Sequence, residues 1–241
     1  MSMAPNGETF QYVGNELDLF AAAIRWKAYL ADQLRPFLGE EVLEVGAGLG
    51  ATTRLLCGPW QRRWIGLEPD PSLASRAARA VEAGTLPASV QIRAGTLETV
   101  SRGEMFDTVL YVDVLEHIQD DVGEAVLAAA HLRPGGFLAV LAPAHQWLFS
   151  PFDMAIGHCR RYTRSSLRSV APAHLTLERL RYLDSAGLVA SAANRLLLHQ
   201  SMPTSRQIQL WDRAMVPISR HLDALIRFSA GKSVLGVWRR Q

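Results

Sequence analysis

The chain has 241 residues, of which 49% are hydrophobic, and carries 25 Lys and Arg against 23 Asp and Glu. So much apolar content with a net charge of only +2 excludes a disordered chain. Two cysteines, Cys57 and Cys159, exclude a disulfide framework. The sequence contains no run of about 18 apolar residues, so no membrane span is predicted. Residues 1–12 lack a signal-peptide pattern. We therefore expect a cytoplasmic protein, with residues 1–241 forming one domain.

Strands and helices alternate along the first two thirds of the chain. The strands are nearly continuous apolar runs, which is typical of a parallel sheet covered on both faces. We therefore predict an α/β, Rossmann-like, doubly wound sheet. Its expected elements are a helix over 17–34, a strand over 41–45, a helix over 51–56, a strand over 63–67, a helix over 72–82, strands over 90–94 and 106–112, a helix over 121–132 and a strand over 137–141.

The last third breaks this alternation. A short helix over 165–170 and a strand over 175–182 precede about 45 residues of helical pattern, and a strand over 233–239 ends the chain. The helical residues are expected over 188–198, 205–216 and 218–228, with Pro217 breaking the last two. We predict a seven-stranded, mostly parallel sheet, in which residues 186–230 are a helical insertion that caps the ligand pocket before the last strand.

A glycine loop, Gly46-Ala47-Gly48-Leu49-Gly50, follows the first strand. Such a loop lets a ligand approach the backbone closely. Glu44 stands just before the loop, and Glu68 ends the second strand, where an acid that binds ribose hydroxyls is expected. Carboxylates beside the loop favour a ligand that carries positive charge.

Five segments in order resemble the motifs of class I S-adenosylmethionine-dependent methyltransferases, of the small-molecule type found beside bacterial glycosyltransferases. They are VLEVGAGLG, GLEPD, AGTLETV, FDTVLYVDVLEHI and LRPGGFLAVLAP, between about residues 41 and 164. The resemblance implies S-adenosylmethionine as cofactor. Thr96 departs from it, because the family often has Asp there. The cofactor residues so implied are Glu44, Gly46, Ala47, Gly48, Glu68, Pro69, Gly95, Thr96, Leu97, Val112 and Asp113, and Lys27 is added as a contact of the cofactor carboxylate.

The run Asp113-Val114-Leu115-Glu116-His117 ends the fourth strand, at the sheet edge that binds ligands. Three interpretations remain open: Asp113 lines the cofactor with His117 near the substrate, the run holds a divalent metal as in some similar methyltransferases, or Glu116 and His117 anchor a loop. The run offers few ligands unless His145 or His158 joins it. We predict no metal.

A second polar cluster follows the fifth strand, at the position that normally faces the methyl acceptor. It provides a proton acceptor, aromatic walls and guanidinium groups that bind carboxylate or phosphate. The alternative is that the arginines, with Asp153, form an ion-pair network that holds the loop. The predicted bases are His117 and His158, then His145, and the predicted substrate contacts are Trp147, Asp153, Arg160, Arg161 and Tyr162.

The acidic and basic residues are unevenly distributed. Residues 1–150 hold 11 basic and 18 acidic side chains, whereas residues 151–241 hold 14 basic and 5 acidic ones. In the basic part, Arg206, Arg213, Arg220 and Arg227 recur every seven residues beside an apolar stripe. Three roles of this stripe remain open: packing in the core, contact with an anionic membrane or lipid-linked substrate, and formation of a dimer. No nucleic-acid-binding module is recognised, and the oligomeric state is left open.

The expected activity is methyl transfer to a hydroxyl of a small molecule or of a sugar, including a lipid-linked one. Two alternatives remain: N-methylation of a small-molecule amine, and a non-catalytic protein that binds the cofactor and acts through a partner. A nicotinamide oxidoreductase is disfavoured, because the sequence has no Tyr-x-x-x-Lys pair.

Overall fold

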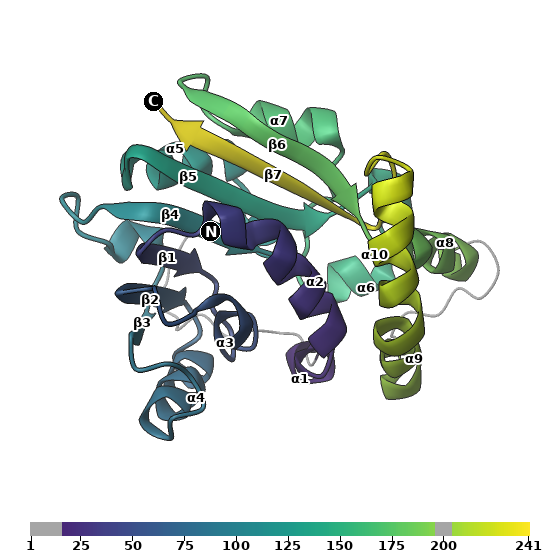
Figure 1. The fold of residues 1–241 in the computed structure, drawn as a ribbon, viewed down its shortest axis with the longest axis horizontal. Coiled ribbons are helices and arrows are strands. Elements are labelled where there is room, and N and C mark those ends of the chain that lie inside the picture. Colours follow the sequence, from purple (N-terminus) through teal and green to yellow (C-terminus); the bar gives the residue numbers. More distant parts are fainter. Residues whose placement is uncertain (1–15, 196–203) are drawn as a thin grey trace.

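The computed structural model describes residues 16–195 and 204–241. Its centre is a seven-stranded sheet with the order β3-β2-β1-β4-β5-β7-β6 (Figure 1). The first five strands in this order pair in parallel, and β7 is antiparallel to β5 and β6. The predicted Rossmann-like, mostly parallel sheet is therefore confirmed. The strands are β1 (Glu41–Val45), β2 (Arg63–Glu68), β3 (Val90–Ala94), β4 (Phe106–Val112), β5 (Leu132–Pro143), β6 (Leu175–Leu183) and β7 (Ser233–Arg240).

Helices cover both faces of this sheet (Figure 1). The helix α2 and the helix made by α9 and α10 share one apolar core, and α5 and α7 share the other. The helices are α1 (Glu16–Ala21), α2 (Ile24–Leu34), α3 (Thr53–Leu56), α4 (Pro71–Glu82), α5 (Asp121–Ala130), α6 (Pro151–Ala155), α7 (Arg164–Val170), α8 (Ser185–Ala193), α9 (Ser205–Leu210) and α10 (Val216–Leu225).

Successive residues of the central strands enter opposite cores. In β1, Leu43 and Val45 pack with α5 and α7, whereas Val42 packs with α2. In β5, Leu138 packs in the core shared with α5 and α7, and Ala139 packs in the core shared with α2. Because both faces are covered, both sets of side chains must be apolar, which explains the continuous hydrophobic runs of the sequence.

The helix break predicted at Pro217 is wrong. The helix runs from Ser205 to Leu225 through a π-helical turn at Trp211–Met215, followed directly by α10. A proline within a helix leaves the carbonyl four residues earlier without its partner. Here that carbonyl, of Arg213, accepts a hydrogen bond from Nη1 of Arg25 at 3.0 Å. The π turn and this outside donor accommodate the proline without a break.

Other differences lie at the ends of elements. The helix predicted over 17–34 is divided at residues 22 and 23 into α1 and α2. The strand β5 begins at Leu132 and includes the predicted turn, with a register shift against β4. The short helix α6 was not predicted. The helix α8 begins three residues before its predicted start, and residues 196–198 of that prediction lie outside the described residues.

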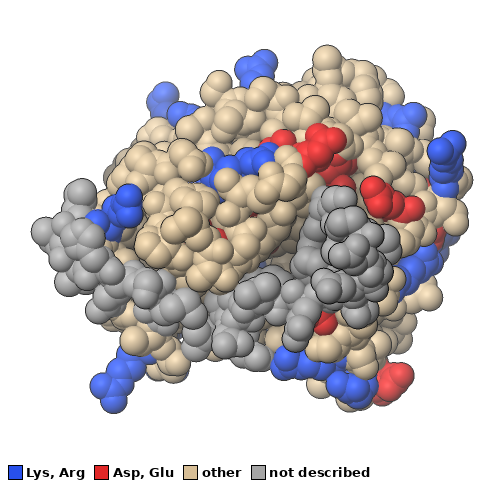
Figure 2. Space-filling view, turned by 180° about the vertical axis from the view of Figure 1, so that it is seen from behind, with Lys and Arg blue, Asp and Glu red and all other residues tan. Residues whose placement is uncertain are grey.

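The described part of the face in Figure 2 does not form a basic patch. On the described part of the face in Figure 2, uncharged residues predominate and most Lys and Arg side chains lie along the outline. Within residues 16–195 and 204–241, no helix combines the length and the hydropathy needed to cross a bilayer.

Candidate active site

A cavity of about 920 Å³ lies at the carboxyl ends of β1, β2 and β4. Ligands of open α/β sheets bind at this edge. The glycine loop and Glu68 line one part of the cavity, and His117, His158 and Arg161 line another. Residues of α1, α2, α8 and the α9–α10 helix, including Phe20, Trp26, Ala190 and Trp211, also line it and are mostly apolar.

The glycine loop is fastened to the neighbouring strand by its own backbone. The amides of Gly46 and Ala47 both donate to the carbonyl of Leu67 at 2.8 Å. Gly46 has a φ of 74°, and a Cβ there would come within 2.4 Å of Cγ2 of Val114. The turn therefore requires glycine at this position. Beside it, Ala47 and Gly48 line the cavity, as predicted cofactor contacts should.

Glu68 faces this loop from the end of β2. One carboxylate oxygen accepts from the amide of Gly48 at 2.8 Å, and the other accepts from the amide of Asp70 at 2.9 Å. Burial raises the pKa of Glu68, although both hydrogen bonds oppose this. Each oxygen keeps acceptor capacity for a ligand hydroxyl. Pro69, Gly95, Thr96 and Val112 line the same part of the cavity.

Lys27 and Asp113 bring opposite charges to the cavity. Burial lowers the pKa of Lys27 to about 8, although Asp113 and Asp212 oppose this. Its ammonium group donates to the carbonyl of Phe20. Asp113 has a φ of 54° at the end of β4 and lines the cavity. Desolvation by the surrounding protein raises the pKa of Asp113, although the residue is exposed to solvent at the cavity.

Two predicted cofactor residues are not in the lining. Glu44 is buried, and its carboxylate accepts hydrogen bonds from Oγ1 of Thr53 at 2.5 Å and from Nε1 of Trp64 at 2.9 Å. Burial raises the pKa of Glu44 to about 7. Leu97 is fully buried in the core beside α5. Both side chains therefore support the cavity wall from outside.

Glu116, His117 and His158 come together at the other end of the cavity. One ligand atom from each lies within 4.8 Å of the others, and the two imidazole rings are 4.6 Å apart. Glu116 is completely buried, and among residues 16–195 and 204–241 neither of its carboxylate oxygens has a hydrogen-bond partner. Its pKa is raised by burial and by Asp113. One carboxylate with two imidazoles is a donor set that suits a divalent metal. The sequence analysis named His145 and His158 as residues that could join this run, and the structure brings His158 there from 41 residues after His117.

Asp153 holds His158 in a fixed orientation. Its Oδ1 lies 2.9 Å from Nδ1 of His158, and both its oxygens accept from the guanidinium of Arg161, at 2.8 and 3.0 Å. Burial would raise the pKa of Asp153, but the bonds from His158 and Arg161 outweigh it and keep the pKa below its usual range. An ionised carboxylate only accepts, so Nδ1 of His158 carries the proton. The other nitrogen, Nε2, lies 3.7 Å from Oε1 of Glu116 and is left as an acceptor.

The remaining predicted residues separate into two groups. His117 lines the cavity, and burial, together with His158, lowers its pKa to about 4. His145, Trp147, Arg160 and Tyr162 do not line the cavity. His145 stacks on Tyr182, Trp147 is 52% exposed, and Arg160 and Tyr162 both contact Asp121, at 2.6 and 2.7 Å.

Asp153 is also behind the lining, where it contacts Arg161 and His158. The alternative of an ion-pair network thus describes Asp153 and Arg161, although Arg161 also faces the cavity.

Lys232 was missed by the sequence analysis. It lines the cavity at the start of β7, with Nζ 3.7 Å from Asp184 and 4.0 Å from the centre of the Trp211 ring. Burial lowers its pKa, although Asp184 and Asp113 oppose this. Its only sequence signal is that it is one of two lysines in the chain.

Comparison with known proteins identifies the family. The model of the methyltransferase domain family matches residues 16–178, which is more than half of the chain. The chain belongs to the methyltransferase domain family. It is a class I domain, and S-adenosylmethionine is the methyl donor of its class. The glycine loop, with Glu68 opposite it, forms a cradle on the cavity that fits this cofactor.

Similar proteins include two ubiquinone biosynthesis O-methyltransferases. The protein of Bradyrhizobium sp. strain ORS 278 is 33% identical over 129 residues, which are 52% of this chain and 48% of that protein. The protein of Methylobacterium sp. strain 4-46 is 32% identical over 176 residues, 68% of this chain and 66% of that protein. For most of these curated relatives, the methyltransferase domain described here spans about half of their length.

Solved structures share the fold at low identity. A geranyl diphosphate methyltransferase in complex with S-adenosylmethionine has a TM-score of 0.64 at 15% identity, covering 98% of this chain and 93% of its own. The N-methyltransferase NodS of Bradyrhizobium japonicum WM9, in complex with S-adenosyl-L-homocysteine, has a TM-score of 0.57 at 16% identity, covering 91% and 88%. At such identities the likeness supports the methyltransferase fold alone.

Proposed function

We propose that this methyltransferase domain transfers a methyl group from S-adenosylmethionine to a hydroxyl of an amphiphilic small molecule. The observation that carries the proposal is His158, which lines the cavity while the hydrogen bond to Asp153 fixes its tautomer and leaves Nε2 as the proton acceptor. The O-methyltransferase relatives support a hydroxyl as the acceptor group. A sugar or another ring, including a lipid-linked one, provides such a hydroxyl.

The bound cofactor supplies an electrophilic methyl group, so the protein has to position the reactants, exclude water and accept a proton. Gly46, Ala47 and Gly48 would hold the cofactor against the loop backbone, and Glu68 would accept from its ribose hydroxyls. Lys27 would pair with its carboxylate.

On the acceptor side, Nε2 of His158 takes the proton of the attacking hydroxyl. Because Asp153 already occupies Nδ1, proton uptake gives an imidazolium paired with the ionised Asp153, with the carboxyl group of Glu116 on its other side. Nearby negative charge stabilises that cation. Arg161 keeps Asp153 ionised throughout. His117 is the weaker base, since its pKa of about 4 makes it a poor proton acceptor near neutral pH.

We also propose that the described parts of the predicted insertion over 186–230, which are residues 186–195 and 204–230, form a helical cap within a single domain. Gly187, Gln207 and Trp211, from this segment, line the same cavity as Gly46 and His117. The cap adds apolar surface beside Arg161, which suits an acceptor with a polar head and an apolar part. A Met215→Trp substitution, which fills part of the cap side, is expected to raise KM for the acceptor and to leave cofactor affinity unchanged. Equal effects on both would contradict the cap.

The proposed activity is tested with methyl-labelled S-adenosylmethionine and an acceptor panel. The panel pairs alkylated phenols and alkyl glycosides with amines of the same skeletons, and with tail-free versions of each. We expect label in the tailed hydroxyl compounds, and its loss in His158→Gln. Label confined to amines would replace the proposal by N-methylation. Tight cofactor binding without transfer to any member would favour a non-catalytic binding protein.

A further inference from the structure

The helix from Ser205 to Leu225 has an inward face that holds both of its acidic residues. Asp212 accepts a hydrogen bond from the amide of Trp26 at 2.8 Å, and Asp223 accepts one from the hydroxyl of Tyr29, also at 2.8 Å. Both carboxylates are buried against α2. Both acidic side chains of this helix therefore have hydrogen-bond partners inside the protein, and neither is exposed.

The outward side of the same helix carries large apolar side chains among its exposed polar ones. Leu210, Ile218 and Leu225 are 63%, 57% and 80% exposed. They are spaced by eight and seven residues. The π turn between Leu210 and Val216 takes up more residues than an α turn, so the spacing of eight returns to the same side. These three side chains therefore form one exposed stripe, which we call the outer stripe.

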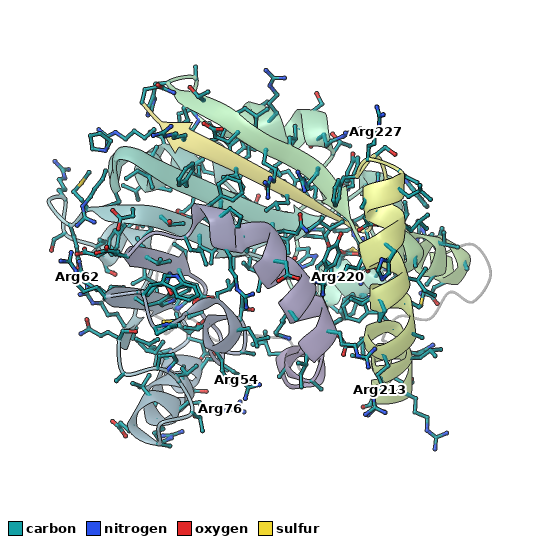
Figure 3. All side chains as sticks on the ribbon, in the orientation of Figure 1. Arg54, Arg62, Arg76, Arg213, Arg220 and Arg227 are labelled. Atoms are coloured by element: carbon teal, nitrogen blue, oxygen red, sulfur yellow. The ribbon has the colours of Figure 1, made fainter. Side chains whose placement is uncertain are left out.

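Arginines accompany the outer stripe. Arg206, Arg213, Arg220 and Arg227 are exposed and recur every seven residues. From Ser205 to Arg227, all exposed Lys, Arg, Asp and Glu side chains are arginines. Figure 3 shows Arg213 and Arg227 towards opposite ends of the helix, with Arg220 between them on the side of α2, where it pairs with Asp32. The exposed formal charge along this helix is entirely positive.

We propose that the outer stripe and its arginines dock on an anionic lipid bilayer. Exposed Leu and Ile side chains beside basic residues match a helix that lies in the membrane interface, with guanidinium groups on lipid phosphates. A second copy of the chain is the poorer partner. A two-fold interface built on the stripe would bring the exposed arginines of two helices near one another, and like charges across an interface oppose association.

Docking at this face would bring the cavity to the bilayer. Gln207, Leu210 and Trp211 of the same helix line the cavity, so Leu210 belongs both to the outer stripe and to the cavity wall. This second part of the inference rests on the proposed function: an amphiphilic acceptor would enter the cavity from the lipid phase, with its hydroxyl towards His158. This second part concerns delivery of the acceptor. The docking itself can be tested separately, because vesicle binding needs neither acceptor nor cofactor.

Docking is tested by co-sedimentation of the full chain with vesicles of phosphatidylcholine alone or mixed with phosphatidylglycerol. We expect binding to the anionic vesicles that weakens as salt rises. The double variant Leu210→Ser/Leu225→Ser is expected to weaken binding at least tenfold, and Arg213→Gln about fivefold. Matched controls are Val126→Ser on α5 and Arg76→Gln on α4, both exposed and away from this helix (Figure 3 for Arg76), which should bind like the parent chain.

Absent binding to anionic vesicles would overturn the proposal, as would binding that the stripe and arginine variants leave unchanged. A dimer seen by light scattering that Leu225→Ser dissociates, together with absent vesicle binding, would assign the stripe to a second copy instead. Circular dichroism of each variant checks that the fold is intact. Vesicle binding in a chain that methylates no hydroxyl would retain the docking and reject only the proposed function.

Discussion

The two parts of the cavity are built in different ways. The cofactor side consists of the glycine loop, Glu68, and Gly95 and Thr96, all of which directly follow or end strands of the parallel sheet. The acceptor side consists of Glu116, His117, His158 and Arg161, with Lys232 and the helices α8 to α10 nearby. Its residues come from four separate stretches of the chain, joined by polar contacts such as those of His158 with Glu116 and of Lys232 with Asp184.

This difference suggests a division of labour. Backbone amides and one carboxylate hold a ligand on the cofactor side, where the groups are fixed by strand geometry. The acceptor side contains the titratable groups, and their protonation states depend on each other through Asp153 and Glu116. Substitutions on the first side should change affinity, and substitutions on the second should change turnover or stability.

The largest effect is expected at His158. His158→Gln removes the proposed proton acceptor, and we expect turnover with a hydroxyl acceptor to fall by about 10²- to 10⁴-fold. The measurement is kcat at saturating cofactor and acceptor. The matched control is His145→Gln, because His145 stacks on Tyr182 outside the lining. Equal turnover of the His158 variant and the control would exclude His158 as the base.

Asp153→Asn sharpens the comparison through stability. It removes the charge that faces the largely buried guanidinium of Arg161. Breaking one partner of a buried ion pair costs about 3–5 kcal/mol. Urea denaturation should record a loss of this size in the free energy of unfolding. Asp32→Asn is the control, since Asp32 pairs with Arg35 and Arg220 at the surface, where such pairs contribute about 0–1 kcal/mol. Similar losses in both variants would contradict the buried pair.

Glu68→Ala addresses the cofactor side. Hydrogen bonds to a charged group are worth about 1.5–3 kcal/mol, so we expect the affinity for S-adenosylmethionine to fall by about 10- to 100-fold. Isothermal titration calorimetry measures this directly. Glu98→Ala is the control, because Glu98 is exposed and lies outside the lining. An unchanged Kd in Glu68→Ala would refute the ribose assignment.

A smaller, pH-dependent effect is expected at Lys27. With a pKa of about 8, Lys27 is charged below that pH and loses its charge above it. If it pairs with the cofactor carboxylate, Kd stays level up to about pH 7.5 and then rises, by about tenfold or less. Lys27→Met should bind more weakly at low pH and lose the rise. A Kd of the parent chain that is level up to pH 9.5 would reject this contact.

Metal removal should have the smallest effect. The proposed proton transfer uses Nε2 of His158, which a metal on Glu116, His117 and His158 would occupy. Extensive dialysis against EDTA is therefore expected to leave kcat unchanged. Activity that is lost on chelation and restored by Mg²⁺ or Zn²⁺ would contradict the base and make these three residues the ligands.

The same comparison explains what the sequence could predict. Gly46, Gly48 and Glu68 are adjacent to apolar strand patterns, so their place at the carboxyl edge follows from local sequence. The continuous apolar runs also predicted the covered parallel sheet. The motif pattern misled at Glu44 and Leu97, which stand beside motif residues but do not line the cavity. Glu44 faces the side of β1 opposite to Val45, and Leu97 begins a short 3-10 helix and is buried in the core.

On the acceptor side, local sequence was insufficient. The contact of His158 with Glu116 joins residues 42 positions apart, and Lys232 enters the cavity only because β7 inserts between β5 and β6. Pro217 predicted a break because proline normally disrupts a helix. The hydrogen bond from Arg25 to the carbonyl of Arg213, which accommodates the proline, comes from a helix nearly 190 residues earlier and has no local signal. Tertiary contacts decide these features.

One paired measurement tests the division of labour most directly. Calorimetric Kd for S-adenosylmethionine and kcat at saturating cofactor are determined for Glu68→Ala and His158→Gln alongside the parent chain. The account predicts that Kd rises only in Glu68→Ala and that kcat falls only in His158→Gln. If His158→Gln raised Kd as much as Glu68→Ala and kept its kcat, the two sides of the cavity would not have the separate roles assigned to them.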